Sequence, residues 1–177
     1  LVHIAIQGRE AATEDRPPLN LVFLIDTSGS MNDPQKLPLL VQSFRLMLDR
    51  LTPEDDETRP AIIDGLAAAI YKQAEQANLL EDYRAAAGHF LRIKALAPTS
   101  SIRSGAEYDA AAALMKLEDW TQASDVLEEF RASHPDHELN ADATKQLAYI
   151  YREDGQTARS AAEHERIAAE AEDPELS

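Results

Sequence analysis

The first fifty residues alternate between short apolar runs and polar connections. Val2, Ile4 and Ile6 alternate with polar or small residues, which is the pattern of a strand with one buried face. Residues 21–25 are a continuous apolar run, which is typical of a strand covered on both faces. After Pro34, apolar residues recur at mostly helical spacings to about residue 51. This segment therefore predicts two strands and a helix.

Thr52-Pro53 ends the predicted helix, and the acidic run Glu54-Asp55-Asp56-Glu57 follows it. We interpret residues 53–59 as a solvated linker. From residue 60 to the end of the chain, the apolar positions follow helical spacing and indicate no further strand. We therefore expect a mainly α chain, in which residues 1–52 form a small α/β segment and residues 60–177 form a helical one.

The helical part repeats itself at an offset of 37 residues. The aligned positions are Ala74, Ala111 and Ala148; Ala77, Leu114 and Tyr151; Ala86, Ala123 and Ser160; and Ile93, Phe130 and Ile167. Pro98 and Pro135 close the first two units, and Pro174 lies two residues beyond the register of the third. A period of this length predicts about three stacked helix pairs.

Each repeat unit has the features of two helices joined by a tight turn. Alanine in the middle of the first helix leaves room for a partner helix to cross closely. Glu81-Asp82-Tyr83 recurs as Glu118-Asp119-Trp120, and the acidic residue is placed to cap the second helix. Proline then ends that second helix. A single pair cannot bury its apolar side alone, so neighbouring pairs must stack.

These positions resemble the tetratricopeptide repeat. The small-residue, aromatic-turn, alanine and terminal-proline positions of that family are matched by Ala74, Tyr83, Ala86 and Pro98, and again by Ala111, Trp120, Ala123 and Pro135. The third unit carries Thr157 and Ser160 instead, which predicts a degenerate or capping repeat. The resemblance covers about two-thirds of the chain. It implies a non-catalytic scaffold that binds a peptide or helix of another protein in a groove.

By that resemblance, the groove is lined by the first helices of the pairs, between their core positions. The residues that we expect there are Lys72, Gln73, Gln76, Asp109, Ala112, Lys145 and Gln146. The alternative interpretation is that each of them is an ordinary solvated position on a helix.

A second motif, Asp26-Thr27-Ser28-Gly29-Ser30, follows the predicted buried strand. Hard cations such as Mg²⁺ and Mn²⁺ take oxygen ligands. A carboxylate and two hydroxyls at alternating positions of a strand-to-helix loop can converge on one such ion. The alternative is that these side chains only cap the following helix or its preceding turn.

Residues Leu21 to Met31 resemble the first central strand and the metal-ion-dependent adhesion site of a von Willebrand factor A domain. The resemblance implies a metal site at Asp26, Ser28 and Ser30, where the Mg²⁺ or Mn²⁺ would also bind an acidic side chain of a partner protein. It stops near Thr52, where that family continues with further strands that supply a threonine and a second aspartate. We therefore expect a fragment of that domain with an incomplete metal site.

Charge limits the partners of the chain. Its 32 acidic and 17 basic residues give a formal net charge of −15, and nearly all of the excess lies beyond residue 50. Phosphate backbones would be repelled, so no nucleic acid is expected, whereas a basic protein partner would be attracted. No apolar run reaches the roughly 20 residues of a membrane span. The chain has no cysteine for disulfides or thiolate metal sites.

No pattern supports an enzyme. Ser28 lacks the context of a catalytic serine, Gly29 does not make a phosphate loop, and His134 and His137 flank a proline in a turn rather than forming a metal pair. We therefore expect an interaction adaptor, and leave its self-association open. The alternatives are metal-dependent adhesion and a chimeric or truncated chain without a dedicated function. The resemblances favour the bacterial envelope (periplasm), with the cytoplasm as the alternative.

Overall fold

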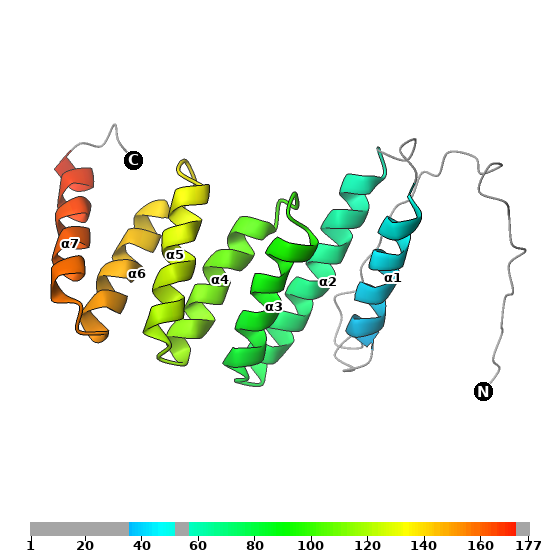
Figure 1. Cartoon of the computed structure of the whole chain (residues 1–177), viewed down its shortest axis with the longest axis horizontal. Helices are drawn as coiled ribbons and strands as arrows, with labels where there is room; N and C mark the ends of the chain where they lie inside the picture. The colour runs from blue at the N-terminus through cyan, green and yellow to red at the C-terminus, as the bar shows by residue number, and fades with distance from the viewer. Residues whose placement is uncertain (1–35, 52–56, 173–177) are drawn as a thin grey trace, which may run out of the picture.

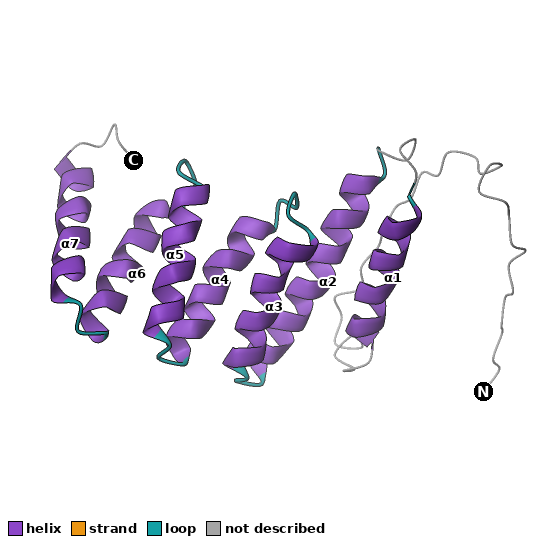
Figure 2. Ribbon diagram, in the orientation of Figure 1, coloured by secondary structure: helices purple, strands orange, loops and turns teal. Residues whose placement is uncertain are grey.

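The computed structural model describes residues 36–51 and 57–172, and these residues form helices joined by short turns (Figure 2). The helices of these ranges are α1 (Lys36–Arg50), α2 (Arg59–Leu79), α3 (Tyr83–Leu96), α4 (Arg103–Lys116), α5 (Trp120–Ser133), α6 (Asn140–Glu153) and α7 (Thr157–Glu172). The predicted mainly α fold and the helix expected up to residue 51 are confirmed. The two predicted strands lie outside the described residues.

The helices lie in one row, and each packs against the next one in the chain (Figure 1). In the view of Figure 1, α1, α3, α5 and α7 form a front layer, and α2, α4 and α6 lie behind them. From α2 onward, each helix of the rear layer is the first helix of a pair and the helix after it is the second. The described part of the chain is therefore a tetratricopeptide-like array of three helix pairs, with α1 added at its N-terminal end.

The hydrophobic core runs between the two layers along the row. Ala74, Ala111 and Ala148, the small residues at equivalent repeat positions, are buried as the sequence predicted. The second helices contribute large side chains that are almost completely buried, namely Phe90, Ile93, Leu127 and Phe130. Alanine at the crossing points lets two helices approach closely, while the larger groups fill the space on either side.

The same turn joins the two helices of each pair. Its residues Glu81, Glu118 and Gly155 lie 37 residues apart and have φ values of 59°, 57° and 72°. In each turn, the backbone N–H of the residue after this one donates to the carbonyl oxygen five residues before it. The N–O distances are 2.9, 3.0 and 2.7 Å for the N–H groups of Asp82, Asp119 and Gln156. This is the bond that ends a helix in a Schellman motif. The third pair therefore keeps this geometry although its turn sequence departs from the other two.

The predicted caps of the second helices are present in the first two pairs. Asp82 Oδ1 accepts a hydrogen bond from the Ala85 N–H at 3.1 Å, and Asp119 Oδ1 accepts one from the Gln122 N–H at 3.3 Å. Each satisfies one of the amides that a helix N-terminus leaves without an internal partner. The aromatic residue after each aspartate is half-buried against the core, as expected.

The helix α1 shares its core with the repeats. Leu37, Val41 and Phe44 are buried, and a Cβ built on Gly65 of α2 would lie 2.7 Å from the Phe44 ring. The α2 helix has 21 residues, whereas α4 and α6 have 14 each. The additional N-terminal turns of α2, which include Gly65, supply part of the surface on which α1 packs. The helix that the sequence assigned to the N-terminal segment therefore belongs structurally to the array.

Candidate interaction surface

Tyrosine hydroxyls join the first helices of the three pairs. Tyr71 of α2 donates a hydrogen bond to Asp109 of α4. One repeat further along, Tyr108 of α4 donates to Asp142 of α6, and Gln146 Nε2 donates to the Tyr108 hydroxyl. These contacts align polar side chains from three successive first helices on one continuous face of the array.

Both tyrosines are held as neutral hydrogen-bond donors. Burial raises the pKa of Tyr71 well above its ordinary value, and the hydrogen bond to Asp109 and the charge of that carboxylate raise it further. Burial and Asp142 raise the pKa of Tyr108 in the same way, although the hydrogen bond from Gln146 partly opposes them. The hydroxyls therefore stay protonated at neutral pH and keep donating to the neighbouring helix.

We call this face the first-helix surface. Its residues are Tyr71, Lys72 and Glu75 of α2, Tyr108, Asp109 and Ala112 of α4, and Asp142, Lys145, Gln146 and Tyr149 of α6. Lys72, Asp109 and Gln146 occupy equivalent positions, 37 residues apart. Because one position carries a cation, an anion and an amide in successive pairs, the chemistry of the surface changes along the row. Such a surface can distinguish partners by sequence.

Five of the seven predicted partner-binding residues lie on the first-helix surface. Lys145 is exposed, whereas Lys72, Asp109, Ala112 and Gln146 are half-buried. The Lys72 ammonium forms an ion pair with the Glu75 carboxylate, at 2.9 Å. The structure thus brings these five residues to one face, and their binding to a partner stays a prediction.

Gln73 and Gln76, the other two predicted residues, lie on α2 beside this face. Only 9% of the Gln73 surface is exposed, and its Oε1 accepts a hydrogen bond from Arg92 Nη2 of α3 at 2.5 Å. Gln73 therefore bridges the two helices of the first pair. Gln76 is half-buried.

The tyrosines of the first-helix surface were not among the partner-binding residues predicted from the sequence. Tyr71 and Tyr108 are one repeat apart, so the offset of 37 residues was a signal that could have found them. Tyr149 is 41% exposed at the position equivalent to Ala112, and it meets the Trp120 ring edge-on with 6.0 Å between centroids. Asp142 carries no repeat signal, because a glycine stands one repeat before it.

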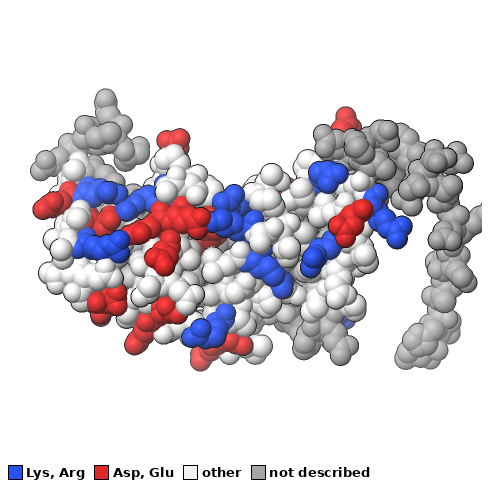
Figure 3. Space-filling view, viewed as in Figure 1, with Lys and Arg blue, Asp and Glu red and all other residues white. Residues whose placement is uncertain are grey.

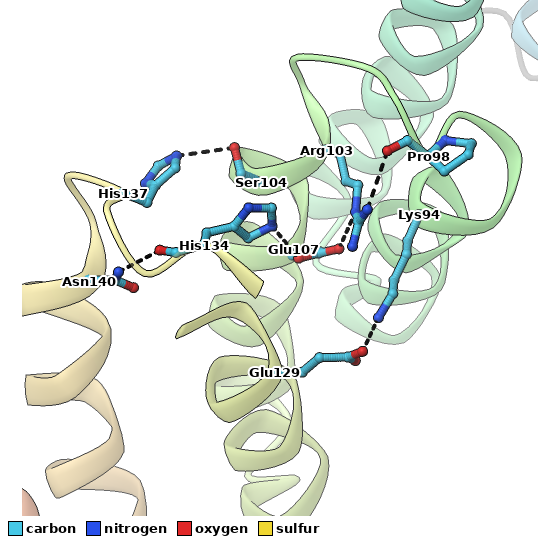
Figure 4. A network of polar contacts seen from close by, with 9 residues as sticks. All are labelled: Lys94, Pro98, Arg103, Ser104, Glu107, Glu129, His134, His137 and Asn140. Atoms are coloured by element: carbon cyan, nitrogen blue, oxygen red, sulfur yellow. Dashed lines mark hydrogen bonds and ion pairs between the residues drawn. The ribbon is translucent and has the colours of Figure 1, made fainter. Parts of the chain in front are cut away.

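A second polar network lies at the end of the second pair, where the chain leaves α5 (Figure 4). Glu107 of α4 is only 3% exposed, and its carboxylate lies 2.8 Å from Arg103 Nε and 3.2 Å from His134 Nε2. His137 Nε2 lies 3.1 Å from Ser104 Oγ. Both histidine rings therefore tie the loop after α5 back to α4, which agrees with a structural role for this turn.

The predicted metal ligands Asp26, Ser28 and Ser30 lie outside the described residues, so the Mg²⁺ or Mn²⁺ site stays a prediction. Within residues 36–51 and 57–172, no group of three or more histidine, aspartate or glutamate side chains is arranged to hold a metal ion. No helix in the described part of the chain combines the length and the apolar character needed to cross a membrane.

No protein-family model matches the chain. A stretch of 56 residues, 32% of this chain, is 41% identical to the uncharacterized protein YfbK of Escherichia coli (strain K12). That stretch covers only 10% of YfbK.

Two crystal structures of a putative kinesin light chain with nearly identical TPR-like repeats from Podosopora anserina are similar to the array. The alignment with one of them, at 16% sequence identity, covers 80% of this chain and 77% of the kinesin light chain structure, with a TM-score of 0.49. The other, at 15% identity, covers 78% and 76%, with a TM-score of 0.48. Because both the sequence identities and the TM-scores are low, the fold rests on the helix packing and the repeated turns of this chain itself.

Proposed function

We propose that this chain is a non-catalytic adaptor that binds a segment of another protein across the first-helix surface. The observation that carries the proposal is the alignment of α2, α4 and α6 by the Tyr71–Asp109 and Tyr108–Asp142 hydrogen bonds. These bonds hold three successive helices side by side, so a peptide or helix lying across the row would contact side chains from all three pairs. Stacked repeats commonly bind their partners over an extended surface of this kind.

The chemistry of the surface favours a partner that carries basic and apolar side chains. Glu75, Asp109 and Asp142 are carboxylates, and two of them already face tyrosine donors rather than cations. The chain as a whole has a net charge of −15, which would steer a basic segment toward it. The exposed ring of Tyr149 offers an apolar surface with a polar tip, a side chain that is common at protein interfaces.

The test begins by selecting peptides from a random phage-displayed library against the whole chain. The best binder is then titrated by isothermal titration calorimetry against two variants. Ala112→Arg places a long cation at the half-buried centre of the surface, and we expect it to weaken binding by about tenfold or more. Ala132→Arg makes the same change at an exposed position of α5 in the other layer, so it should bind like the parent.

Two outcomes would contradict the proposal. One is a selection that yields no specific peptide. The other is a peptide whose affinity is the same for Ala112→Arg as for the parent, while circular dichroism shows that all three proteins are folded.

Metal-dependent adhesion through Asp26, Ser28 and Ser30 is the second candidate, and the sequence of that turn is its support. An ion that binds only the folded chain raises the unfolding temperature. The test is thermal unfolding with and without millimolar Mg²⁺ or Mn²⁺, on the parent and on Asp26→Ala. A rise that is lost in Asp26→Ala supports this function, and an unchanged midpoint in both proteins removes it.

A further inference from the structure

The helix α1, at the N-terminal end of the row, carries apolar side chains on two opposite sides. Leu37, Val41 and Phe44 are buried on the side that packs against the array. Leu39 and Leu46 lie on the opposite side, and each is 61% exposed. The end of a stacked array normally presents a polar outer face to water. The outer side of α1 instead has the character of a surface that packs against another element.

A hollow of about 280 Å³ lies on the outer side of α1. Among the described residues, it is lined by Gln42, Arg45, Leu46 and Asp49. They stand at positions i, i+3, i+4 and i+7 of the helix, the set of four residues that forms a hole for a side chain of a facing helix. The hollow therefore has the arrangement that receives one side chain of a second helix.

The hollow has a cation and an anion beside its leucine. Arg45 and Asp49 are both exposed, and none of the ion pairs between described residues involves either of them. They lie one turn apart with the basic residue first, which is the less favourable order for a pair along one helix. Figure 3 shows basic and acidic groups together at the α1 end of the array. A facing helix can therefore pair with both charges.

We propose that α1 packs antiparallel against α1 of a second copy of this chain, about a two-fold axis close to Leu46, and that the chain thereby forms a weak dimer. Leu46 of each copy then enters the hollow of the other. Arg45 of each copy lies near Asp49 of the other, because an antiparallel arrangement about this point brings the two positions together. Two-fold symmetry makes every contact occur twice. The order of cation, leucine and anion along α1 is thus complementary to itself.

The size of this surface sets the expected strength of the dimer. One side of a 15-residue helix is a small interface beside the roughly 800 Å² per partner of a typical stable complex. We therefore expect association at high micromolar concentrations, with the two Arg45–Asp49 pairs contributing mainly specificity. The outer side of α1 shares no residue with the first-helix surface, so the dimer does not depend on the proposed function. A dimer would carry two such surfaces.

The test measures sedimentation velocity of the whole chain at concentrations up to about 1 mM. Arg45→Asp and Asp49→Arg each place four like charges together in the dimer, and we expect each to weaken dimerisation by about tenfold or more. An equimolar mixture of these two variants should recover the association of the parent, because opposite charges again face each other. Arg84→Asp makes the same charge change at an exposed position of α3 and should dimerise like the parent.

A parent that stays monomeric up to about 1 mM would overturn the proposal. A dimer that the two α1 variants leave unchanged, or a mixture that does not recover association, would overturn it as well.

A single introduced thiol distinguishes a second copy from another part of the same chain as the group that covers α1. The chain has no cysteine, so Gln42→Cys supplies one thiol at the hollow. We expect it to react with a maleimide as fast as Ala132→Cys, at an exposed position of α5, in dilute solution. At high micromolar concentration only the Gln42→Cys thiol should react more slowly. Slow reaction in dilute solution would overturn the proposal, because the chain itself would then cover the hollow.

Discussion

Ser160 of α7 donates a hydrogen bond to the carbonyl oxygen of Ala148 in α6, with 2.9 Å between the two oxygens. The equivalent positions of the first two pairs are Ala86 and Ala123. Ser160 is only 6% exposed, so its hydroxyl needs a partner inside the array, and the neighbouring helix supplies one. The third pair therefore accommodates a polar residue at the close crossing of α6 and α7, and the two helices remain packed there.

We expect Ser160→Ala to change the free energy of unfolding by no more than about 1 kcal/mol, because it restores the alanine of the other pairs. The Ala148 carbonyl lies within α6, where the helix provides its own donor. Ser160→Leu should destabilise by about 1–3 kcal/mol, since its larger side chain does not fit the crossing. Urea unfolding measures both values. Equal losses for the two variants would show that the hydrogen bond, rather than the space, is what matters.

The repeat could be predicted from the sequence because one structural requirement recurs at a fixed offset. A close crossing needs a small residue, so Ala74, Ala111 and Ala148 align, and all three are buried. The caps at Asp82 and Asp119 follow from the chemistry of a helix N-terminus. These features depend on local sequence and on the nearest neighbour, both of which a period reveals.

Contacts between particular side chains could not be predicted in the same way. Gln73 has the spacing of a surface residue, but Arg92 reaches it from the next helix and it is buried. The packing of Phe44 on Gly65 depends on turns of α2 that lie before the repeat register. No aromatic or apolar pattern in the sequence marks Asp109, so only the structure shows that its carboxylate accepts a hydrogen bond from the Tyr71 hydroxyl.

The contact between Phe44 and Gly65 predicts opposite effects for one substitution at two glycines. In Gly65→Ala the new methyl would lie 2.7 Å from a ring that is 1% exposed, so α1 or the ring must shift. We expect a loss of about 1–3 kcal/mol. Gly88→Ala, in α3, meets nothing within 4 Å and should stabilise by up to about 1 kcal/mol, because alanine favours the helix. Chemical denaturation compares the two variants.

Hydrogen exchange locates the effect of Gly65→Ala. The amides of α1 should exchange faster in this variant, whereas those of α5 to α7 should be little changed, because stability in a stacked array is largely local. Unchanged protection of α1 would mean that α1 does not depend on its contact with α2.

The residue of the helix-to-helix turn that has a positive φ predicts different effects on stability for two opposite substitutions, Gly155→Ala and Glu118→Gly. Gly155 has φ of 72°, so Gly155→Ala should cost about 1 kcal/mol. Glu118 has φ of 57° at the same turn position, and Glu118→Gly relieves that strain while adding freedom to the unfolded chain. We therefore expect Glu118→Gly to lie within about 0.5 kcal/mol of the parent. Thermal unfolding of both variants measures these changes in stability. A Gly155→Ala variant as stable as the parent would contradict the prediction.

Arg131 and Glu163 form a two-pronged ion pair between α5 and α7, with N–O distances of 2.6 and 3.0 Å. Their side chains are 20% and 10% exposed. Burial acts to raise the pKa of Glu163, but the hydrogen bond and charge of Arg131, with the charges of Arg166 and Arg159, outweigh it and lower that pKa below 4.5. The carboxylate is therefore more acidic in the folded than in the unfolded chain, and ionisation stabilises the fold.

The sign of this shift sets the pH range in which Glu163→Gln matters. At neutral pH the variant leaves Arg131 without its anion, and we expect a loss of about 3 kcal/mol. As pH falls below 4.5 and through the lowered pKa, the parent loses the same contribution while the variant does not, so the two stabilities should converge. Glu165→Gln, at an exposed position of α7, is the control and should follow the parent. Urea unfolding from pH 7 to pH 3 measures the difference, and a constant gap across that range would mean that Glu163 contributes through packing rather than charge.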